Sequence, residues 1–253
     1  MTNPFKYSVG TRVRDGVFMS MLKPEQGDRI LDVGCGLGYF TNMLSGAGAE
    51  CIGVDLDARC INYCQKNLEG TYVLADINKL PFPDSYFNKV LCTEVLEHVN
   101  HNGVVIREIR RVLQANGAMV VSVPCSEGVF KSLFKRIGHN SVGENSYEYH
   151  WHKGYTEEGI KHLLWHHHFE IRDVYYTLVL GVEAFMGLSK VVIRLLRAKK
   201  IDSQANALEV ENTLLWKVYC RLFPAVLLLA RLEQPLARYI KGHMVIVKGM
   251  CVK

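Results

Sequence analysis

The chain has 253 residues, of which 49% are hydrophobic and 22% are charged, so it can bury a large core and is not intrinsically disordered. Lysine and arginine (30) exceed aspartate and glutamate (25), and the net charge of +5 is too small to indicate a nucleic-acid-binding protein by itself. Residues 179–241 hold ten of the basic and five of the acidic side chains, so the excess positive charge belongs to that segment.

The predicted elements of the first two thirds alternate between short β-rich runs and helical stretches. The β-rich runs are Arg29 to Val33, Cys51 to Asp55, Thr71 to Ala75, Lys89 to Thr93 and Ala118 to Val123. Before the last run, Val105, Ile109, Val112 and Leu113 have the spacing of one buried helix face, and Asn116-Gly117 predicts the end of that helix. This alternation predicts an α/β fold with a parallel sheet covered by helices on both sides.

The remaining third departs from this rhythm. A polar stretch from Cys125 to Lys153 predicts a loop or lid over the strand ends, and Thr156 predicts the N-cap of a following helix. Two further strands are predicted at Phe169 to Thr177 and His243 to Val252. We therefore expect residues 1–178 and 242–253 to form one domain and residues 179–241 to form a helical insertion.

The predicted insertion is apolar and basic. Its first helix, Val182 to Lys200, carries Lys190, Arg194 and Arg197 at helical spacing, and Pro224 predicts a kink or a division in its second helix, Leu214 to Leu232. Such amphipathic helices can lie in the headgroup layer of an anionic membrane. They can equally pack over the sheet, line an acceptor pocket or form the interface of a homodimer.

The cysteines and the apolar runs predict the compartment. None of the eight cysteines forms a Cys-x-x-Cys pair and most lie in apolar runs, which predicts reduced, buried thiols in a cytoplasmic protein. The first fifteen residues lack the apolar core of a signal peptide, and runs such as Leu222 to Ala230 are too short to span a bilayer. We expect no membrane-spanning segment, and a position on the inner face of a membrane if the insertion binds lipid.

The most specific motif is LDVGCGLGYF, from Leu31 to Phe40, which follows a predicted strand and opens a helix. Glycine permits positive φ angles and lets a ligand approach the backbone, as in nucleotide-binding turns. The dinucleotide fingerprint G-x-G-x-x-G is not met, because Tyr39 stands where its last glycine would be. The carboxylate of Asp32 would repel a pyrophosphate but suits S-adenosylmethionine, which has no phosphate and carries a sulfonium and an ammonium group.

Two more carboxylates end the next two predicted strands. Asp55 follows the glycine loop by about twenty residues, where an acidic side chain can accept both ribose hydroxyls. Asp76 is placed to accept the adenine amino group beside Ile77. Alternatively, Asp55 or Asp57 only caps the next helix and Asp76 is a turn residue. Taken together, acids at the ends of three consecutive strands predict one edge of a nucleoside site.

Four segments carry a family resemblance. In chain order, LDVGCGLGYF, GVDLD, ADINKLPFPDSYFNKVLCTEVLEHV and REIRRVLQANGAMVVSVP resemble successive motifs of the class I S-adenosylmethionine-dependent methyltransferases, in particular the ubiquinone/menaquinone and small-molecule branch. The resemblance runs from about Gly27 to Ile171 and implies a Rossmann-like, mostly parallel sheet of seven strands that ends in an antiparallel hairpin. The chain departs from the family at Tyr86 to Val90 and at His167 to Phe169, outside the implied cofactor contacts.

The resemblance also implies a cofactor and its binding residues. The cofactor would be S-adenosyl-L-methionine and the product S-adenosyl-L-homocysteine. By the resemblance, Asp32, Gly34 and Gly36 lie along the methionine, Asp55 meets the ribose, Asp76 and Ile77 meet the adenine, and Thr93 and Glu94 lie under the sulfonium. Cys35, Gly38 and Leu56 complete the expected cofactor-binding set.

Histidines are the candidate catalytic residues. Methyl transfer needs mainly alignment and exclusion of water, and a base only for acceptors such as hydroxyls. His98 follows the fourth predicted strand, and His150 and His152 precede the late helix, where Trp151 and Tyr155 could form aromatic walls. Alternatively, His98 only orders its loop and the other residues form a packed lid without chemistry.

Neither a metal nor a nucleic acid is expected as a partner. The consecutive residues His166, His167 and His168 point in different directions on a helix, and no further ligand at suitable spacing completes His150 and His152. The predicted core is charge-balanced, the chain has no N-P-P-Y tetrapeptide, and its basic helices carry aliphatic rather than stacking aromatic side chains.

The sequence therefore predicts methyl transfer from S-adenosylmethionine to a small-molecule or lipid-linked acceptor, at oxygen or carbon. Two alternatives stay open. One is a catalytically silent binding module of the same fold at a membrane surface. The other is an NAD-dependent oxidoreductase, which the glycine spacing and Asp32 disfavour.

Overall fold

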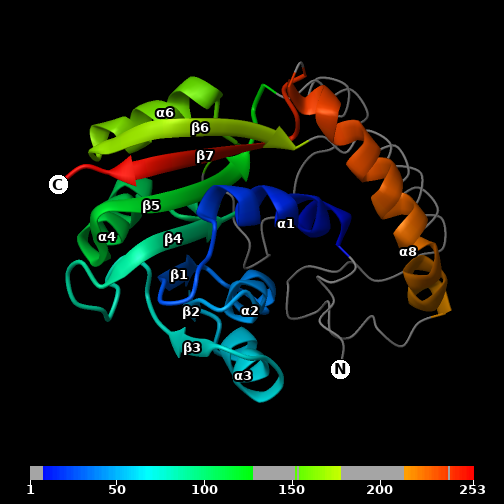
Figure 1. Cartoon of the computed structure of the whole chain (residues 1–253), viewed down its shortest axis with the longest axis horizontal. Helices are drawn as coiled ribbons and strands as arrows, with labels where there is room; N and C mark the ends of the chain where they lie inside the picture. Colours follow the sequence, from blue (N-terminus) through cyan, green and yellow to red (C-terminus); the bar gives the residue numbers. More distant parts are fainter. Residues whose placement is uncertain (1–7, 128–151, 153, 178–213, 239) are drawn as a thin grey trace.

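The computed structural model describes residues 8–127, 152, 154–177, 214–238 and 240–253. Most of the predicted lid and the first predicted helix of the insertion lie outside these residues. The described part contains one seven-stranded sheet flanked by helices (Figure 1). The strands are β1 Arg29–Val33, β2 Glu50–Asp55, β3 Thr71–Leu74, β4 Phe87–Thr93, β5 Leu113–Pro124, β6 Phe169–Thr177 and β7 Met244–Cys251.

The strand order is β3-β2-β1-β4-β5-β7-β6, and β7 runs antiparallel to both of its neighbours. The other neighbouring strands pair in parallel, in the registers Ile30↔Cys51, Ile52↔Thr71, Ile30↔Lys89 and Lys89↔Ala118. This is the Rossmann-like sheet with a terminal antiparallel hairpin that the resemblance implies, so the predicted fold class is confirmed. Because β1 to β4 are parallel, their carboxyl ends meet at one edge of the sheet.

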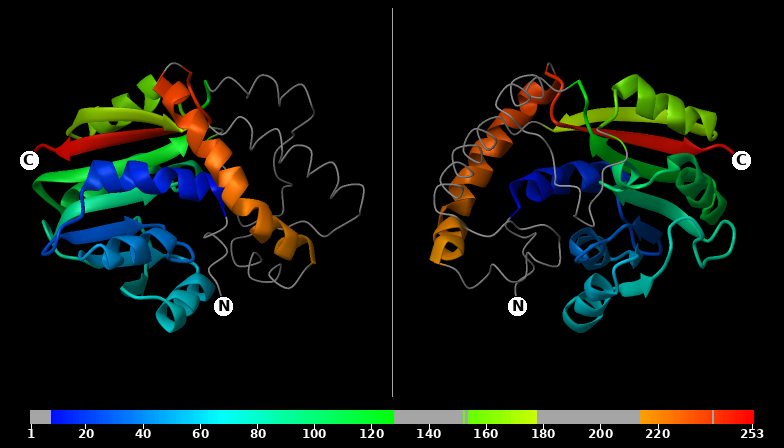
Figure 2. Two further views of the ribbon diagram at one scale, coloured as in Figure 1. Left: turned by 45° about the vertical axis from the view of Figure 1, so that its right-hand side comes forward. Right: turned by 180° about the vertical axis from the view of Figure 1, so that it is seen from behind.

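Helices cover both faces of the sheet (Figure 2). Their bounds are α1 Val9–Leu22, α2 Tyr39–Gly46, α3 Ala58–Asn67, α4 Asn102–Val112, α6 Glu157–His166 and α8 Leu214–Glu233, with short 3-10 helices η2 Leu96–His98 and η4 Gln234–Arg238. The apolar strands alternate between two cores. Ile30, Leu91 and Val120 pack under α1 and α2, whereas Val90 and Val121 pack under α4 and α6. A strand buried on both faces needs a continuous apolar run, which is the pattern seen in the sequence.

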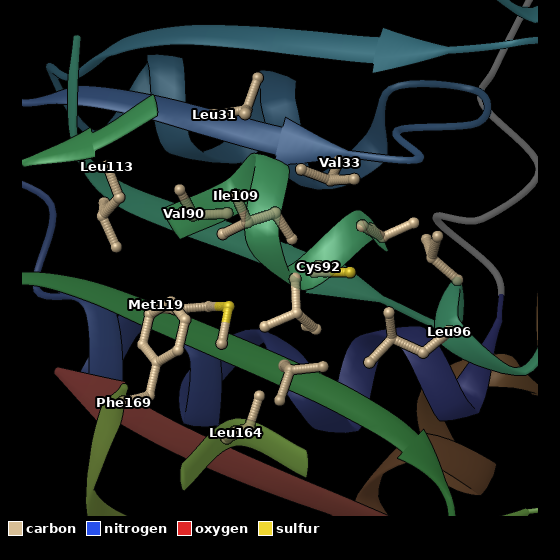
Figure 3. Packing of buried hydrophobic residues seen from close by; sticks show 14 of the residues in the cluster. Leu31, Val33, Val90, Cys92, Leu96, Ile109, Leu113, Met119, Leu164 and Phe169 are labelled. Atoms are coloured by element: carbon tan, nitrogen blue, oxygen red, sulfur yellow. The ribbon is translucent and has the colours of Figure 1, made fainter. Parts of the chain in front are cut away.

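The core beneath α4 and α6 fills the space between these helices and the sheet. Figure 3 shows Val90 and Met119 on the strands, with Ile109 of α4 and Leu164 of α6 pointing toward them. All four side chains are fully buried. Removing such a side chain down to alanine costs on the order of 2–5 kcal/mol in other proteins, so this core is a main source of stability.

The predicted end of α4 and the predicted division of the helix at Pro224 differ in the structure. Helix α4 ends at Val112, and Leu113 already belongs to β5, so the predicted end at Asn116-Gly117 is wrong. Leu113 is fully buried in β5, and an apolar residue at this spacing also suits a buried helix face, so the spacing could not separate the two elements. Pro224 lies inside the single helix α8 and does not divide it. Proline has no N–H group to donate to the carbonyl one helical turn earlier. Pro224 is exposed, so water can donate to that carbonyl instead.

Helix α8 extends the domain beyond the sheet. Its Phe223, Leu227 and Ala230 pack on Val9 and Val13 of α1. Figure 1 shows α8 beyond the carboxyl ends of β5 and β6, and η4 contacts β6.

Within the residues that the structure describes, no helix has the length and apolar character needed to cross a membrane. Six of the eight cysteines are buried and two are half-buried, as the sequence predicts.

Candidate functional site

The glycine loop between β1 and α2 is fixed to the neighbouring strands. The N–H groups of Gly34 and Cys35 donate to the carbonyl of Val54 at 2.8 and 2.9 Å. Gly34 has φ of +72°, and a Cβ atom there would collide with the side chain of Val95. Only glycine fits this position, so the loop lies tightly between β2 and the residues that follow β4.

Gly38, at the start of α2, has a different requirement. Its φ is +73°, and a Cβ atom would lie 2.8 Å from side-chain atoms of Cys64, Leu68 and Tyr72. These residues come from α3, its end and β3, which pack beneath the loop. The absence of a side chain at Gly38 is therefore needed for packing, whether or not a ligand also approaches it.

Asp32 lies under the glycine loop and is only 1% exposed. Its Oδ2 accepts a hydrogen bond from the Thr41 hydroxyl at 2.6 Å, while Oδ1 is buried without a hydrogen-bond partner in the described residues. Burial raises the pKa of Asp32 to about 6; the Thr41 hydrogen bond opposes this rise and the nearby Asp55 adds to it. An unsatisfied, buried carboxylate oxygen favours a cationic or N–H-donating ligand group beside it.

Asp55 ends β2 and faces the glycine loop. Its Oδ2 accepts from Gly36 N at 2.8 Å and its Oδ1 from Asp57 N at 2.9 Å. Asp57, and not Asp55, caps α3 by accepting from Arg59 N at 2.8 Å. The capping alternative therefore holds for Asp57 only. Leu56 beside Asp55 is 73% exposed, so the Asp55 carboxylate is flanked by an open apolar surface.

Asp76 follows β3 and takes a turn role. Its Oδ1 accepts from the backbone and side-chain N–H groups of Asn78 at 2.9 and 2.8 Å. The side chain is exposed, and the adjoining Ile77 packs partly against the core under α4 and α6. Ala75 N donates to Asp55 O at 3.0 Å, which holds the ends of β2 and β3 side by side. The structure thus places Asp76 on the same sheet edge as Asp32 and Asp55.

An ion pair lies where β4 ends. Thr93 is the last residue of β4, and Glu94 follows with φ of +53°, a conformation that costs energy for a residue other than glycine. The Arg14 guanidinium donates from Nη2 to Glu94 Oε2 at 2.8 Å and from Nε to Gly10 O at 2.9 Å. Its Nη1 is buried without a hydrogen-bond partner in the described part of the chain. Arg14 therefore has donor capacity left for a ligand.

The charge of Glu94 is maintained by Arg14. Desolvation by the surrounding protein raises the pKa of Glu94, but the Arg14 charge and hydrogen bond, with His243 and His98, lower it below its usual value. Because 47% of the Glu94 side chain is exposed, water limits the effect of desolvation on its pKa. We therefore attribute the net lowering of the Glu94 pKa to Arg14. Glu94 is therefore an anion beside a buried cation.

Sequence reasoning missed Arg14. A signal for it exists, because Arg14 lies at helical spacing with Phe18, Met21 and Leu22, so a charged residue occupies the apolar face of α1. It also missed Glu97, in η2, which is 1% exposed and whose Oε2 has no hydrogen-bond partner among the described residues. Burial raises the pKa of Glu97 to about 8; its own N–H opposes this, and Glu94 adds to it.

His243, just before β7, is a further missed residue. Burial, together with the Arg14 charge, lowers the pKa of His243 to about 4, so the imidazole is neutral near pH 7. Arg14, Glu94, Glu97 and His243 come from distant parts of the chain and act on one another electrostatically. We call these four residues the edge cluster, because they lie where β4 ends.

The structure brings two of the candidate histidines together around η2. His98 belongs to η2, and its charge acts on Glu94. The backbone N–H of His152 donates to the backbone carbonyl of Glu97 at 3.2 Å, and the imidazole Nε2 of His152 lies 3.5 Å from Asn102 Nδ2. His150 and Trp151 lie outside the described residues. In the parts of the chain that the structure describes, no three His, Cys, Asp or Glu side chains are placed to hold a metal ion.

Tyr155 differs from its expected role as an aromatic wall. Its hydroxyl donates to Leu96 O at 3.0 Å and accepts from Asn102 Nδ2 at 2.9 Å. The ring is buried in the core beneath α4 and α6. Tyr155 therefore anchors η2 to the segment before α6, because its polar end is fully used in that contact.

Comparisons with known proteins agree with this geometry. A family model described as a methyltransferase domain matches residues 31–121. The ubiquinone biosynthesis O-methyltransferase of Azorhizobium caulinodans is 35% identical over 106 residues, which cover 40% of this chain and 42% of that protein. A malonyl-[acyl-carrier protein] O-methyltransferase of Legionella pneumophila is 30% identical over 131 residues, covering 49% of this chain and 45% of that protein. The chain thus spans less than half the length of these curated relatives.

A solved structure shows the same fold over nearly the whole chain. The phosphoethanolamine N-methyltransferase 2 of Haemonchus contortus, solved in complex with S-adenosyl-L-methionine, aligns with a TM-score of 0.60 at 16% identity. That alignment covers 95% of this chain and 52% of the other. Residues 31–121 of this chain therefore match a methyltransferase domain, and the chain shares the fold of that solved structure.

Proposed function

We propose that the chain transfers a methyl group from S-adenosylmethionine to a small-molecule or lipid-linked acceptor, at oxygen or carbon. The observation that carries the proposal is the row of carboxylates Asp32, Asp55 and Asp76 along one sheet edge around the glycine loop. Such an edge repels phosphate groups and favours a cationic nucleoside. The family match supports the same cofactor.

The buried groups fit the amino-acid end of this cofactor. That end carries an ammonium and a carboxylate, and it therefore needs one anionic and one cationic partner. Asp32 offers its unsatisfied Oδ1, and Arg14 offers its unsatisfied Nη1. Ligand groups at these two atoms would satisfy polar groups that are otherwise costly to bury.

The nucleoside end fits the edge formed by β2 and β3. Asp55 accepts one N–H group on each carboxylate oxygen and keeps further acceptor capacity for ribose hydroxyls. Leu56 is largely exposed and offers an apolar surface to a purine ring. Asp76 and Ile77 lie at the neighbouring strand end, where the adenine amino group is expected.

The bound cofactor supplies a methyl group on a sulfonium, which is an excellent leaving group. The residues of this chain then have to hold the acceptor in line and exclude water. Thr93 and Glu94 form the turn at the end of β4, which Arg14 fixes through its ion pair. His98, His150 and His152 are the proposed proton acceptors for a hydroxyl substrate, and two of them lie at η2.

Transfer of a labelled methyl group tests this proposal. Purified protein is incubated with methyl-labelled S-adenosylmethionine and a fractionated cell extract. We expect label in the lipid or small-molecule fraction, loss of labelling in Asp55→Asn, and near-normal labelling in Asp57→Asn. Asp57→Asn is the matched control, because asparagine also caps helices and Asp57 lies beside the site without facing the glycine loop.

Three outcomes would contradict parts of the proposal. Label in nucleic acid or protein would overturn the acceptor class. A protein that binds the cofactor but labels no fraction would be the catalytically silent module. Binding of NAD in place of S-adenosylmethionine would favour the oxidoreductase alternative.

A further inference from the structure

The outer face of α8 is unusually apolar for a helix surface. Five of the nine exposed large hydrophobic side chains in the described residues belong to α8 or to η4. They are Leu222, Leu228, Leu229, Leu232 and Leu236, each between 46% and 67% exposed. The opposite face of α8 is already used, because Phe223, Leu227 and Ala230 pack on α1. The leucines therefore form a second apolar face without a partner in the described residues.

Basic residues accompany these leucines. Arg221 is exposed and lies seven residues before Leu228, two helical turns along the same face. Arg231 is also exposed, at the border of the apolar face. The sequence from 214 to 238 contains four Lys or Arg residues and a single acidic residue, Glu233. The face thus combines exposed aliphatic side chains with a positive charge.

This combination favours one kind of occupant. A second copy of the chain would leave the interface with an excess of positive charge, because residues 214–238 of each copy carry four basic residues and one acidic residue. An anionic membrane surface accepts both components, because leucines enter the boundary between headgroups and acyl chains while arginines pair with lipid phosphates. We propose that the outer face of α8, with Leu222, Leu228, Leu229, Leu232, Arg221 and Arg231, binds an anionic membrane.

The position of α8 relates this surface to the site. The helix lies beyond the carboxyl edge of the sheet and contacts α1, the helix that carries Arg14 (Figure 2). A membrane bound to the outer face of α8 would therefore lie on the same side of the domain as the sheet edge where the cofactor is proposed to bind. A lipid-linked acceptor could then approach from the membrane surface. The inference goes beyond the proposed methyl transfer and does not depend on it.

Vesicle cosedimentation of the full chain tests the inference. The vesicles contain phosphatidylcholine alone or phosphatidylcholine mixed with phosphatidylglycerol, at low and at moderate salt. We expect at least about tenfold tighter binding to the anionic vesicles, and weaker binding as salt increases. Leu228→Ser with Leu232→Ser should weaken binding to the anionic vesicles about tenfold, since the apolar contact is lost. Arg221→Glu with Arg231→Glu should abolish the preference for anionic lipid.

The matched control is Trp165→Ser, which removes a side chain that is 68% exposed on α6, far from α8 in the chain. Trp165→Ser should bind vesicles as the wild-type protein does. The inference is overturned if the wild-type protein stays in the supernatant under every condition. It is also overturned if the chain is a dimer that Leu228→Ser with Leu232→Ser makes monomeric.

Calorimetric titration with S-adenosylhomocysteine in the same samples separates this inference from the proposed function. Normal titration without vesicle binding rejects the membrane surface alone. Vesicle binding without titration supports the membrane surface and rejects the cofactor. Thermal denaturation of each variant shows whether a loss of binding reflects unfolding.

Discussion

Three ionisable side chains at the candidate site are buried, and burial shifts their pKa values. Burial moves the pKa of Asp32 to about 6, of Glu97 to about 8 and of His243 to about 4, in each case toward the uncharged form. Each of these side chains also has a buried polar atom without a partner in the described residues. Groups of this kind concentrate at functional sites, because a ligand can satisfy them.

Glu97 should make stability depend on pH. The pKa of Glu97 rises from 4.5 to about 8 on folding, so between these values the folded protein binds more protons than the unfolded chain. The stabilisation is complete below the unfolded pKa and is lost as pH rises through the folded one. The effect is on the order of 1.4 kcal/mol per unit of pKa difference. We expect the free energy of unfolding to fall less between about pH 5 and about pH 9 in Glu97→Gln than in the wild-type protein, as measured by urea denaturation at both pH values.

The control for this experiment is Glu158→Gln, whose side chain is 82% exposed on α6. It should keep the wild-type pH dependence. If the free energy of unfolding depends on pH in the same way in Glu97→Gln and in the wild-type protein, the pKa of Glu97 is the same in the folded and unfolded states. That result would contradict the prediction.

Arg14 should control the affinity for the cofactor. Lysine at this position keeps the charge but lacks the planar set of donors that reaches Gly10, Glu94 and a ligand together. We expect Arg14→Lys to weaken binding of S-adenosylhomocysteine by about tenfold or more, measured by calorimetry. Arg107→Lys, on the exposed side of α4, should bind normally. Unchanged affinity in Arg14→Lys would remove Arg14 from the proposed site.

At the scale of elements, the sequence predicts the strands well and the helix ends less well. β1 and β6 begin and end at the predicted residues, and β1 is bounded by Asp28 and Gly34. The predicted end of α4 is wrong because Leu113, the buried first residue of β5, continues the apolar spacing of the helix. Helix α1 was not predicted at all, since Arg14 interrupts its apolar face. Its contribution becomes visible only when Arg14 meets Glu94, which lies 80 residues away in the chain.

Arg111 connects two elements and should contribute measurably to stability. Its guanidinium donates to the carbonyls of Leu80 and Phe82 and to the carboxylates of Asp84 and Glu108, which ties the segment before β4 to α4. Arg111→Lys should lose several of these hydrogen bonds and destabilise the fold by about 1–3 kcal/mol in urea denaturation.

The neighbouring residue offers a matched control for this substitution. Arg110 lies on the same helix, and its guanidinium contacts Val252 O at an exposed position. Arg110→Lys should therefore change stability little. If Arg110→Lys and Arg111→Lys lower the free energy of unfolding equally, the hydrogen bonds of Arg111 to the segment before β4 do not contribute specifically to stability. That result would contradict the prediction.

At the scale of the whole molecule, the row of carboxylates at the sheet edge was predictable and the edge cluster was not. The glycine loop and the acids at the strand ends are contiguous motifs, so spacing alone brings Asp32, Asp55 and Asp76 to one edge. The edge cluster joins Arg14, Glu94 and His243 from the two ends and the middle of the chain. The sequence indicates that α8 is apolar and basic, but only the packing on α1 shows which of its apolar side chains are covered. Such long-range packing leaves no local pattern in the sequence.

The central claim is that the carboxyl edge of β1 to β4 binds a cationic nucleoside without phosphate groups. Calorimetric titration of the folded protein with S-adenosylmethionine, S-adenosylhomocysteine and NAD tests it most directly. We predict binding of the first two at micromolar concentration and none of NAD at about millimolar concentration. Binding of NAD, or no binding of S-adenosylmethionine and S-adenosylhomocysteine at millimolar concentration, would contradict the claim.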